Sequence, residues 1–490
     1  MKLSKRVLFV LLILSISLAA FSLPDQKNPE KGLNSITPHD VYDYCKTMAL
    51  PKYAGRHTGH PGYTEAAKWA ASKFQQWGLK PINKKDGYLQ SYPSPYVVVE
   101  SAEMELFLPK GKTNEGEKEF TTKKLVLEKD FLPMLSSDSG DNRAGLVFAG
   151  WGISAPELGY DDYVGLDVKG KFVLCFRGVP DRSDDRFQEH DHHRHRLQTA
   201  KDKGALGLFY IYPNPLGNPN ADWIQDFTPA LISYTVADML LEEKGIKAEN
   251  LRDDLVTYQV PIRFALGSEI HFKVKAEHFP DATGYNVVGY VEGSDPELKD
   301  ECLIIGGHFD HCGLHCGLLF PGANDNASGS AVVMEIGEAF SRLDNAPKRS
   351  VVFVLFGGEE MGLQGSSFFA DNPPSQFEKM DGMFNFDMVG EGDGVGCGLS
   401  PEPEELASML KEANQQVEIL RGTRFFRGVG VRGSDYASFY VKGVPCISFA
   451  SNGPHLHYHG TGDTIYRINP DIMADIAKLA FITGFNWANR

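Results

Sequence analysis

Five short segments in the C-terminal part of the chain carry side chains that could form one chemical site. They read GGHFDH at 306–311, PGANDNASG at 321–329, FGGEEMGLQGS at 356–366, FNFDMVG at 384–390 and HYHGTGDT at 457–464. Together they supply imidazole and carboxylate groups and contain no cysteine. This mixture of ligands suits a hydrolytic zinc site that keeps one coordination position open.

Each of these segments ends a predicted strand or adjoins one, in a region where strands and helices alternate. The strand-like runs lie at 285–293, 302–310, 350–358, 382–389 and 445–450, and the helical runs at 327–342, 402–418, 434–442 and 470–488. This alternation predicts an α/β fold with a mixed, mostly parallel sheet flanked by helices. Open sheets of this kind bind ligands at the carboxyl ends of their strands.

Two further regions precede this one. Residues 36–79 contain two helix-like runs, and the second, 63–77, ends before Gly78. From about 97 to 275 the chain changes to short β-rich runs separated by Gly, Pro and Asp turns. We therefore expect a separate β-rich part between two parts of the α/β domain.

The first 22 residues have the features of a secretory signal peptide. Three cationic side chains precede an apolar stretch from Val7 to Phe21, and the small residues Ala20 and Ser22 close it. The stretch is shorter than the roughly 20 apolar residues of a spanning helix. The sequence thus predicts a signal peptide at 1–22, a secreted or periplasmic protein, and no stable membrane insertion.

The charge balance excludes one class of partner. The chain has 490 residues, with 49 Lys and Arg against 64 Asp and Glu, which gives a formal charge of −15. A strongly acidic chain repels the phosphate backbone, so we expect no nucleic-acid partner.

Two clusters outside the five segments could also bind metal. Cys312 and Cys316 bracket a histidine, but they lack the second ligand pair of a structural zinc module, which favours a disulfide or two plain thiols. Four histidines lie between 190 and 195 among Arg and Lys residues that would repel a cation. We interpret that tract as a solvated loop leading into a surface helix, outside the active site. His311 and His315 are interpreted as structural neighbours of the site.

The order HxD, ND, EE, a strand-terminal Asp and YHxxxDT resembles the co-catalytic di-zinc aminopeptidase family, which includes bacterial leucyl aminopeptidases, glutamate carboxypeptidase II and the glutaminyl cyclases. The run LVFAGWGISAPELGYDDYVGLDVKGKFVLCFRG resembles the protease-associated (PA) domain often inserted in such chains. The resemblance implies a zinc exopeptidase fold, with 33–96 as the N-terminal part of the peptidase domain, 97–275 as a PA insert and 276–490 as the zinc peptidase domain.

Carried over position by position, the resemblance implies two zinc ions. His308 and Asp387 would hold one ion, Glu360 and His459 the other, and Asp325 would bridge them. With a shared water, this set gives each ion four ligands, which satisfies tetrahedral zinc. Three carboxylates and a bridging hydroxide would neutralise the charge of the pair, so that hydroxide is the expected nucleophile.

The resemblance also assigns three further residues. Glu359 would be the general base, Asp310 would orient His308, and Tyr458 would be an oxyanion donor to the substrate. The spacing agrees, since neighbouring side chains diverge at a strand end, so that Glu360 can bind metal while Glu359 faces the substrate. His308 and Asp310, two residues apart on a strand, lie on one face.

The sequence therefore predicts a secreted zinc-dependent aminopeptidase that acts on peptide or protein N-termini. Two alternatives share the fold, a carboxypeptidase and a glutaminyl cyclase that uses a similar ligand set with one zinc ion. A third is a catalytically dead, receptor-like binding protein, which would gain nothing from keeping Glu359.

Overall fold

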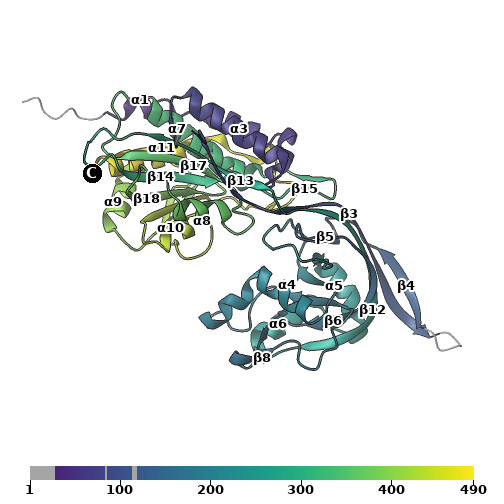
Figure 1. The fold of residues 1–490 in the computed structure, drawn as a ribbon. Coiled ribbons are helices and arrows are strands. Elements are labelled where there is room, and N and C mark those ends of the chain that lie inside the picture. Colours follow the sequence, from purple (N-terminus) through teal and green to yellow (C-terminus); the bar gives the residue numbers. More distant parts are fainter. Residues whose placement is uncertain (1–27, 83–84, 113–117) are drawn as a thin grey trace, which may run out of the picture.

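The computed structural model describes residues 28–82, 85–112 and 118–490. The predicted signal peptide at 1–22 lies outside these residues. In the described part of the chain two large sheets carry the architecture, one of nine strands and one of eight. We call them the main sheet and the insert sheet, and Figure 1 shows them as two parts of the molecule joined by long strands.

The main sheet is mixed and lies between layers of helices, as expected. Its strand order is β1-β13-β17-β14-β18-β21-β19-β20, and β2 pairs with β13. Strands β17, β14, β18 and β21 run parallel at its centre, whereas β13 and β19 pair antiparallel with their neighbours in this run. The bounds are β1 Lys80–Pro81, β2 Leu89–Pro93, β13 Thr283–Val291, β14 Glu301–His308, β17 Ser350–Phe356, β18 Lys379–Phe386, β19 Val395–Leu399, β20 Thr423–Arg427 and β21 Cys446–Ser451.

The central strands are buried on both faces because their side chains alternate between two hydrophobic cores. Leu303 and Ile305 of β14 belong to one core and Ile304 to the other. The first core is covered by α2 (Pro38–Met48), α3 (Pro61–Gln76), α7 (Gly329–Ser341), α9 (Glu404–Asn414) and α11 (Pro470–Asn489). The second is covered by α8 (Gln364–Asp371) and α10 (Tyr436–Tyr440). Fully buried strands rich in Val, Ile and Leu are typical of a parallel sheet with helices on both faces.

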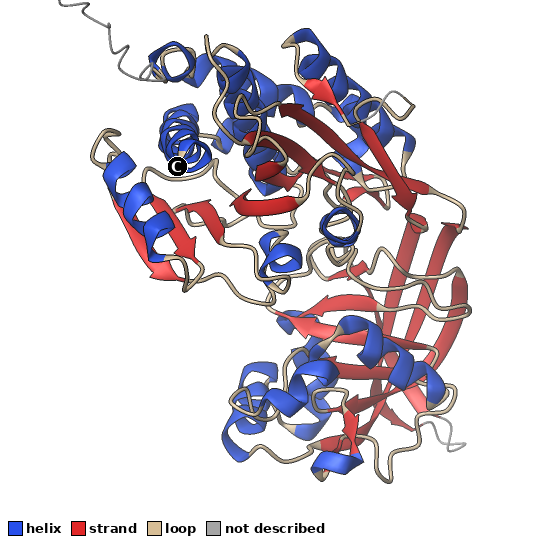
Figure 2. Ribbon diagram, turned by 60° about the vertical axis from the view of Figure 1, so that its left-hand side comes forward, coloured by secondary structure: helices blue, strands red, loops and turns tan. Residues whose placement is uncertain are grey.

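The insert sheet has the strand order β4-β3-β12-β6-β9-β10-β11-β5. Its long strands β3 (Tyr96–Lys112) and β12 (Arg263–Phe279) pair antiparallel and connect the two parts, as Figure 2 shows. Strands β6, β9, β10 and β11 run parallel, and the helices α4 (His193–Asp202), α5 (Tyr234–Leu241) and α6 (Ala248–Tyr258) lie beside them. The other bounds are β4 Lys118–Lys124, β5 Phe131–Pro133, β6 Gly140–Ala149, β9 Phe172–Phe176, β10 Gly207–Tyr212 and β11 Ala230–Ser233.

The interpretation of the histidine tract as a solvated segment agrees with the exposure of His192 and His195 but is wrong for His190 and His193. His190 and His193 are buried, and the ring of His193 meets Tyr210 of β10 edge-on at 5.1 Å. The reason is that α4 packs on the insert sheet and turns Arg196, Leu197 and Ala200 inwards. The high density of charged residues in this tract gave no indication that one face of α4 is buried.

Two other expectations concern cysteines and membranes. All seven cysteines are free thiols, so Cys312 and Cys316 form no disulfide and fit the second of the two alternatives. Among the described residues, no helix is both long and apolar enough to cross a bilayer.

Candidate metal centre

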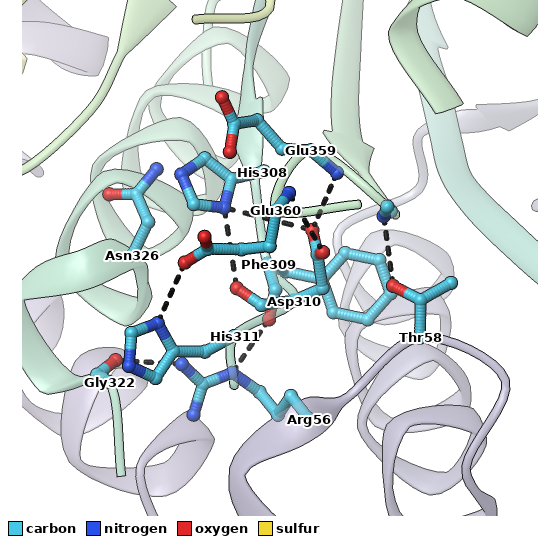
Figure 3. Close-up of polar contacts among 12 residues, drawn as sticks. Arg56, Thr58, His308, Phe309, Asp310, His311, Gly322, Asn326, Glu359 and Glu360 are labelled. Carbon is cyan, nitrogen blue, oxygen red and sulfur yellow. Dashed lines mark hydrogen bonds and ion pairs between the residues drawn. The ribbon is translucent and has the colours of Figure 1, made fainter. Parts of the chain in front are cut away.

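The parallel strands of the main sheet bring the predicted site residues to one edge. His308 is the last residue of β14, Asp387 follows β18, and Glu359 and Glu360 lie shortly after β17. Because the carboxyl ends of parallel strands meet at the same edge, residues distant in sequence become neighbours. Figure 3 shows His308, Glu359 and Glu360 in one region with the loop that carries Asp310 and His311.

A first group of side chains that could hold a metal ion contains His308, Asp325 and Asp387. His308 Nε2 lies 3.5 Å from Asp325 Oδ1 and 3.4 Å from Asp387 Oδ1. One potential ligand atom from each residue lies within 4.8 Å of the other two. His308 and Asp325 are buried, and Asp387 is partly exposed.

A second group surrounds Glu360. Its Oε2 lies 2.9 Å from His459 Nε2, and its Oε1 lies 2.9 Å from Nδ1 of His311. His459 Nε2 also lies 3.2 Å from Asp325 Oδ2. Asp325 therefore directs one carboxylate oxygen towards each group. The structure thus brings together all five residues that were predicted as ligands.

The second group contains two residues, His311 and Cys312, that the sequence analysis did not count among the ligands. His311, Cys312, Glu360 and His459 each place a potential ligand atom within 4.8 Å of the others. His311 was interpreted as a structural neighbour, but it contacts Glu360 directly. Its place in the segment GGHFDHC was the feature that could have suggested a role in the site. His311 lies beyond the end of β14, however, so the alternation of side chains along a strand does not predict where its ring points. His315 does have a structural contact, at 2.7 Å from the carbonyl oxygen of Pro133.

The donor set fits a cation. His459 Nε2 and Asp325 Oδ2 are buried and lie 3.2 Å apart, but neither atom makes a well-aligned hydrogen bond among the described residues. Buried polar atoms are normally paired, so two such atoms facing each other indicate a missing partner. A site of imidazole and carboxylate donors with a thiol nearby is chemically suited to zinc rather than to magnesium or calcium.

The titration of the same residues reflects the excess of carboxylates. Burial alone would lower the pKa of His308, but Glu359 and Asp387 raise it well above its usual value. Burial would likewise lower the pKa of His459, and Glu360 raises it well above the usual value. The enclosed carboxylates thus favour positive charge at this place, which a metal ion would supply.

The two neighbouring glutamates differ in their protonation. Burial raises the pKa of Glu359 well above the usual value. Burial acts in the same direction on Glu360, but His459 and His311 outweigh it and hold its pKa well below the usual value. When the pKa values of two neighbouring carboxyl groups are shifted apart, the one with the higher pKa can carry a proton and the one with the lower pKa can bind a metal.

Backbone contacts hold the site loops in place. The carboxylate of Asp310 accepts hydrogen bonds from the backbone N–H groups of Glu359 and Glu360, at 3.2 and 3.3 Å. Its Oδ1 also lies 3.7 Å from His308 Nδ1. Asp463 accepts from the backbone N–H of Asp325 at 2.9 Å. Asp310 is thus placed between the histidine and the glutamate pair.

The insert part of the chain reaches the same site. His459 Nδ1 donates a hydrogen bond to the carbonyl oxygen of Gly217 at 2.6 Å, which leaves Nε2 directed at Glu360 and Asp325. A hydrogen bond at one ring nitrogen fixes which nitrogen can bind a metal. The ring of Tyr458, half exposed, stacks on His459 with the centroids 3.9 Å apart.

A cleft of about 650 Å³ opens onto the glutamate pair. His459 and Tyr458 line it together with residues of the histidine tract, among them His192, His193 and Arg194. Arg194 also donates to the carbonyl oxygen of Met361, which follows the glutamates, at 2.6 Å. The expectation that the histidine tract lies outside the active site is therefore wrong, because the insert folds back over the strand ends.

Comparisons with known proteins find similarity to peptidases. Residues 286–483 match the model of Peptidase family M28. Aminopeptidase YwaD of Bacillus subtilis (strain 168) is 28% identical over 67% of this chain and 66% of its own length. Leupeptin-inactivating enzyme 1 of Streptomyces exfoliatus is 39% identical over 22% of this chain and 23% of its own length. The chain thus spans between about a quarter and two thirds of the length of these curated relatives.

Solved structures show the same fold. An aminopeptidase from Aneurinibacillus sp. strain AM-1 superposes with a TM-score of 0.64 at 21% identity, over 93% of this chain and 95% of its own. A zinc aminopeptidase from Bacillus subtilis superposes with a TM-score of 0.62 at 18% identity, over 92% and 95%. The predicted α/β fold is confirmed.

Arg56 gives a test of how the site loops are held. Its buried guanidinium donates to the backbone oxygens of Phe309, Pro321 and Gly322, which flank the metal-binding residues, and to that of Met48. The change Arg56→Met would leave these buried acceptors unpaired, and we expect the free energy of unfolding to fall by about 3 kcal/mol or more. Urea unfolding measures the loss.

The matched control is Lys52→Met, at an exposed position of the same segment, Pro51–Arg56. It should leave the unfolding midpoint almost unchanged. Equal midpoints for the two variants would contradict the role given to Arg56.

Proposed function

We propose that this chain is a zinc-dependent aminopeptidase that hydrolyses the peptide bond next to a free N-terminus. The observation that carries the proposal is the position of Asp325, whose two oxygens face His308 on one side and His459 on the other. The family match of residues 286–483 and the aminopeptidase names of several relatives support it. A shared carboxylate between two imidazoles is suited to a pair of ions.

In this proposal His308 and Asp387 hold one zinc ion, Glu360 and His459 hold the other, and Asp325 is shared. When bound, such a pair supplies an acidic water and polarises the scissile carbonyl group. His311 keeps Glu360 oriented through the contact at its Oε1, which leaves Oε2 on the side of His459.

Glu359 is the proposed general base. It lines the cleft, and its backbone is fixed by Asp310. Because burial raises its pKa, the carboxylate can take a proton from water and give it to the departing amine. Tyr458, beside His459 at the cleft, is placed to donate to the carbonyl oxygen of the substrate. Peptide or protein N-termini are the proposed substrates.

The place of action and the role of the insert are further parts of the proposal. The cationic and apolar start of the sequence supports a secreted or periplasmic protein. The insert sheet with its helices is proposed to be a PA domain that forms one wall of the cleft, which the lining residues Arg177, His192 and Arg194 support.

The first test is Glu359→Gln. The amide keeps the size of the side chain but cannot take a proton, so we expect kcat on a leucyl anilide to fall by about 10²- to 10⁴-fold with the zinc content unchanged. The control Glu378→Gln, at an exposed position, should keep wild-type kcat. Near-normal turnover of Glu359→Gln would remove this residue from the mechanism.

The second test separates the peptidase classes. Peptides with a free N-terminus should be cleaved to release the first amino acid, and N-acetylated copies should resist, because only a free amine fits an aminopeptidase. Amino-acid analysis of the products measures this. Equal cleavage of blocked peptides, or release from the C-terminus, would favour the carboxypeptidase alternative.

The third test counts the metal. Elemental analysis of the purified protein should give two zinc ions per chain, and Asp387→Ala should give about one, because only the first ion loses a ligand. A wild-type value of one would favour the glutaminyl cyclase alternative, and a full metal content without hydrolysis would favour a binding protein.

A further inference from the structure

A second cavity, of about 690 Å³, adjoins the cleft that holds the glutamate pair. The two cavities share the lining residues Arg177, Asp191, Tyr212 and Arg432. The two cavities therefore meet at these four side chains, and a molecule bound at Glu359 and His459 lies next to the second cavity. Its volume lies in the range of ligand-binding pockets.

The second cavity is lined by basic side chains from separate segments. Arg177 follows β9, Arg182 lies in the loop beyond it, Arg252 is on α6, and Arg432 comes from the main-sheet part of the chain. Among the described lining residues, Asp191 is the single acid. This gathering of cations stands out in a chain with a formal charge of −15.

Among the described residues, no carboxylate oxygen lies within 4.0 Å of a guanidinium nitrogen of these four arginines. The neighbouring Arg194 and Arg196 are different, since they pair with Asp222 at 2.7 Å and with Asp191 at 3.2 Å. Asp191, the acid of the cavity, is thus already paired with Arg196, which is buried and is not one of the four arginines.

The contacts of the four arginines leave donors available. Arg432 donates to the carbonyl oxygen of Gln188 at 3.2 Å and lies 3.5 Å from His192 Nε2. Neither of these partners of Arg432 is a carboxylate. Burial would lower the pKa of Arg177, but Tyr212 and then Asp191 raise it, so the charge of Arg177 is partly compensated. The positive charge of Arg432 also acts on His192 in the wall of the cleft. Burial lowers the pKa of His192 most, and Arg432 lowers it further. Guanidinium groups bind carboxylates through paired hydrogen bonds of fixed geometry.

The geometry points to a carboxylate-binding subsite in the second cavity, which receives the part of a peptide that follows the scissile bond. This inference rests on the proposed function, since it places the N-terminus of the peptide at the metal centre. The bound group is either the C-terminal carboxylate of a short peptide or an acidic side chain. The chain should therefore select anionic peptides.

Two substrate pairs test the inference and separate the two sources. Leu-Gly-Gly is compared with its C-terminal amide, and Leu-Glu-Glu-amide with Leu-Gln-Gln-amide. We expect kcat/KM to be about 10-fold or more higher for the charged member of at least one pair. A preference in the first pair identifies the terminal carboxylate, and one in the second pair identifies the side chains. The absence of a preference in both pairs would overturn the inference.

The matched variants are the double change Arg182→Gln with Arg252→Gln, and the control Arg186→Gln. Both residues of the double variant line only the second cavity, whereas Arg186 pairs with Asp184 on the surface and lines neither cavity. The double variant should bring the charged-to-neutral ratio of kcat/KM close to one, and the control should keep the wild-type ratio. A wild-type ratio in the double variant would refute the assignment.

A binding measurement distinguishes failure of this inference from failure of the proposed function. Calorimetric titration compares triglutamate with triglutamine, using the wild-type protein and the double variant. Tighter binding of triglutamate to the wild type alone, without hydrolysis of any peptide, would support the subsite and remove the aminopeptidase proposal. Hydrolysis with equal binding of both peptides would do the reverse.

Discussion

The structure depends on gathering buried carboxylates at one edge of the main sheet. Asp325 and Glu360 are buried around His459, and the neighbouring Glu359 is partly buried. Removing charged groups from water is costly unless cations and hydrogen-bond donors surround them. The chain supplies donors from its backbone and imidazoles from His308, His311 and His459. This requirement explains why the strand ends, the loop before α7 and the insert all converge on one place.

Much of this arrangement could be predicted because it follows from short-range rules. The Val- and Ile-rich runs that became β14 and β17 predicted buried strands, and parallel strands place their ends together. His308 and Asp387 lie at such ends, so their proximity needed only the order of elements. Asp325 was harder to predict, since an Asp before a helix is often only a cap, and its position depends on Asp463 far along the chain.

What the sequence could not provide depends on contacts between distant segments. His311 lies beyond the end of β14, where the backbone turns and the period of two no longer indicates a direction. The histidine tract looked solvated because its composition is polar, but the burial of His193 depends on β10 lying beneath α4. Gly217 and His459 are in contact although they lie far apart in the sequence. No local sequence pattern could have predicted such a contact.

The division of the molecule into two cores has a consequence for the site. The candidate metal ligands lie around the strand ends of the main sheet, which has its own hydrophobic core, whereas Arg177, Arg182 and Arg252 belong to the insert, which has another. The antiparallel pair β3 and β12 joins them, and the contacts of Arg194 with Met361 and of Arg432 with Gln188 fix the cleft between them. Because each wall rests on a separately packed core, substitutions in the insert can change the charge of the cleft without moving the carboxylates at the strand ends. The candidate metal ligands and the arginines of the second cavity are thus carried by different parts of one chain.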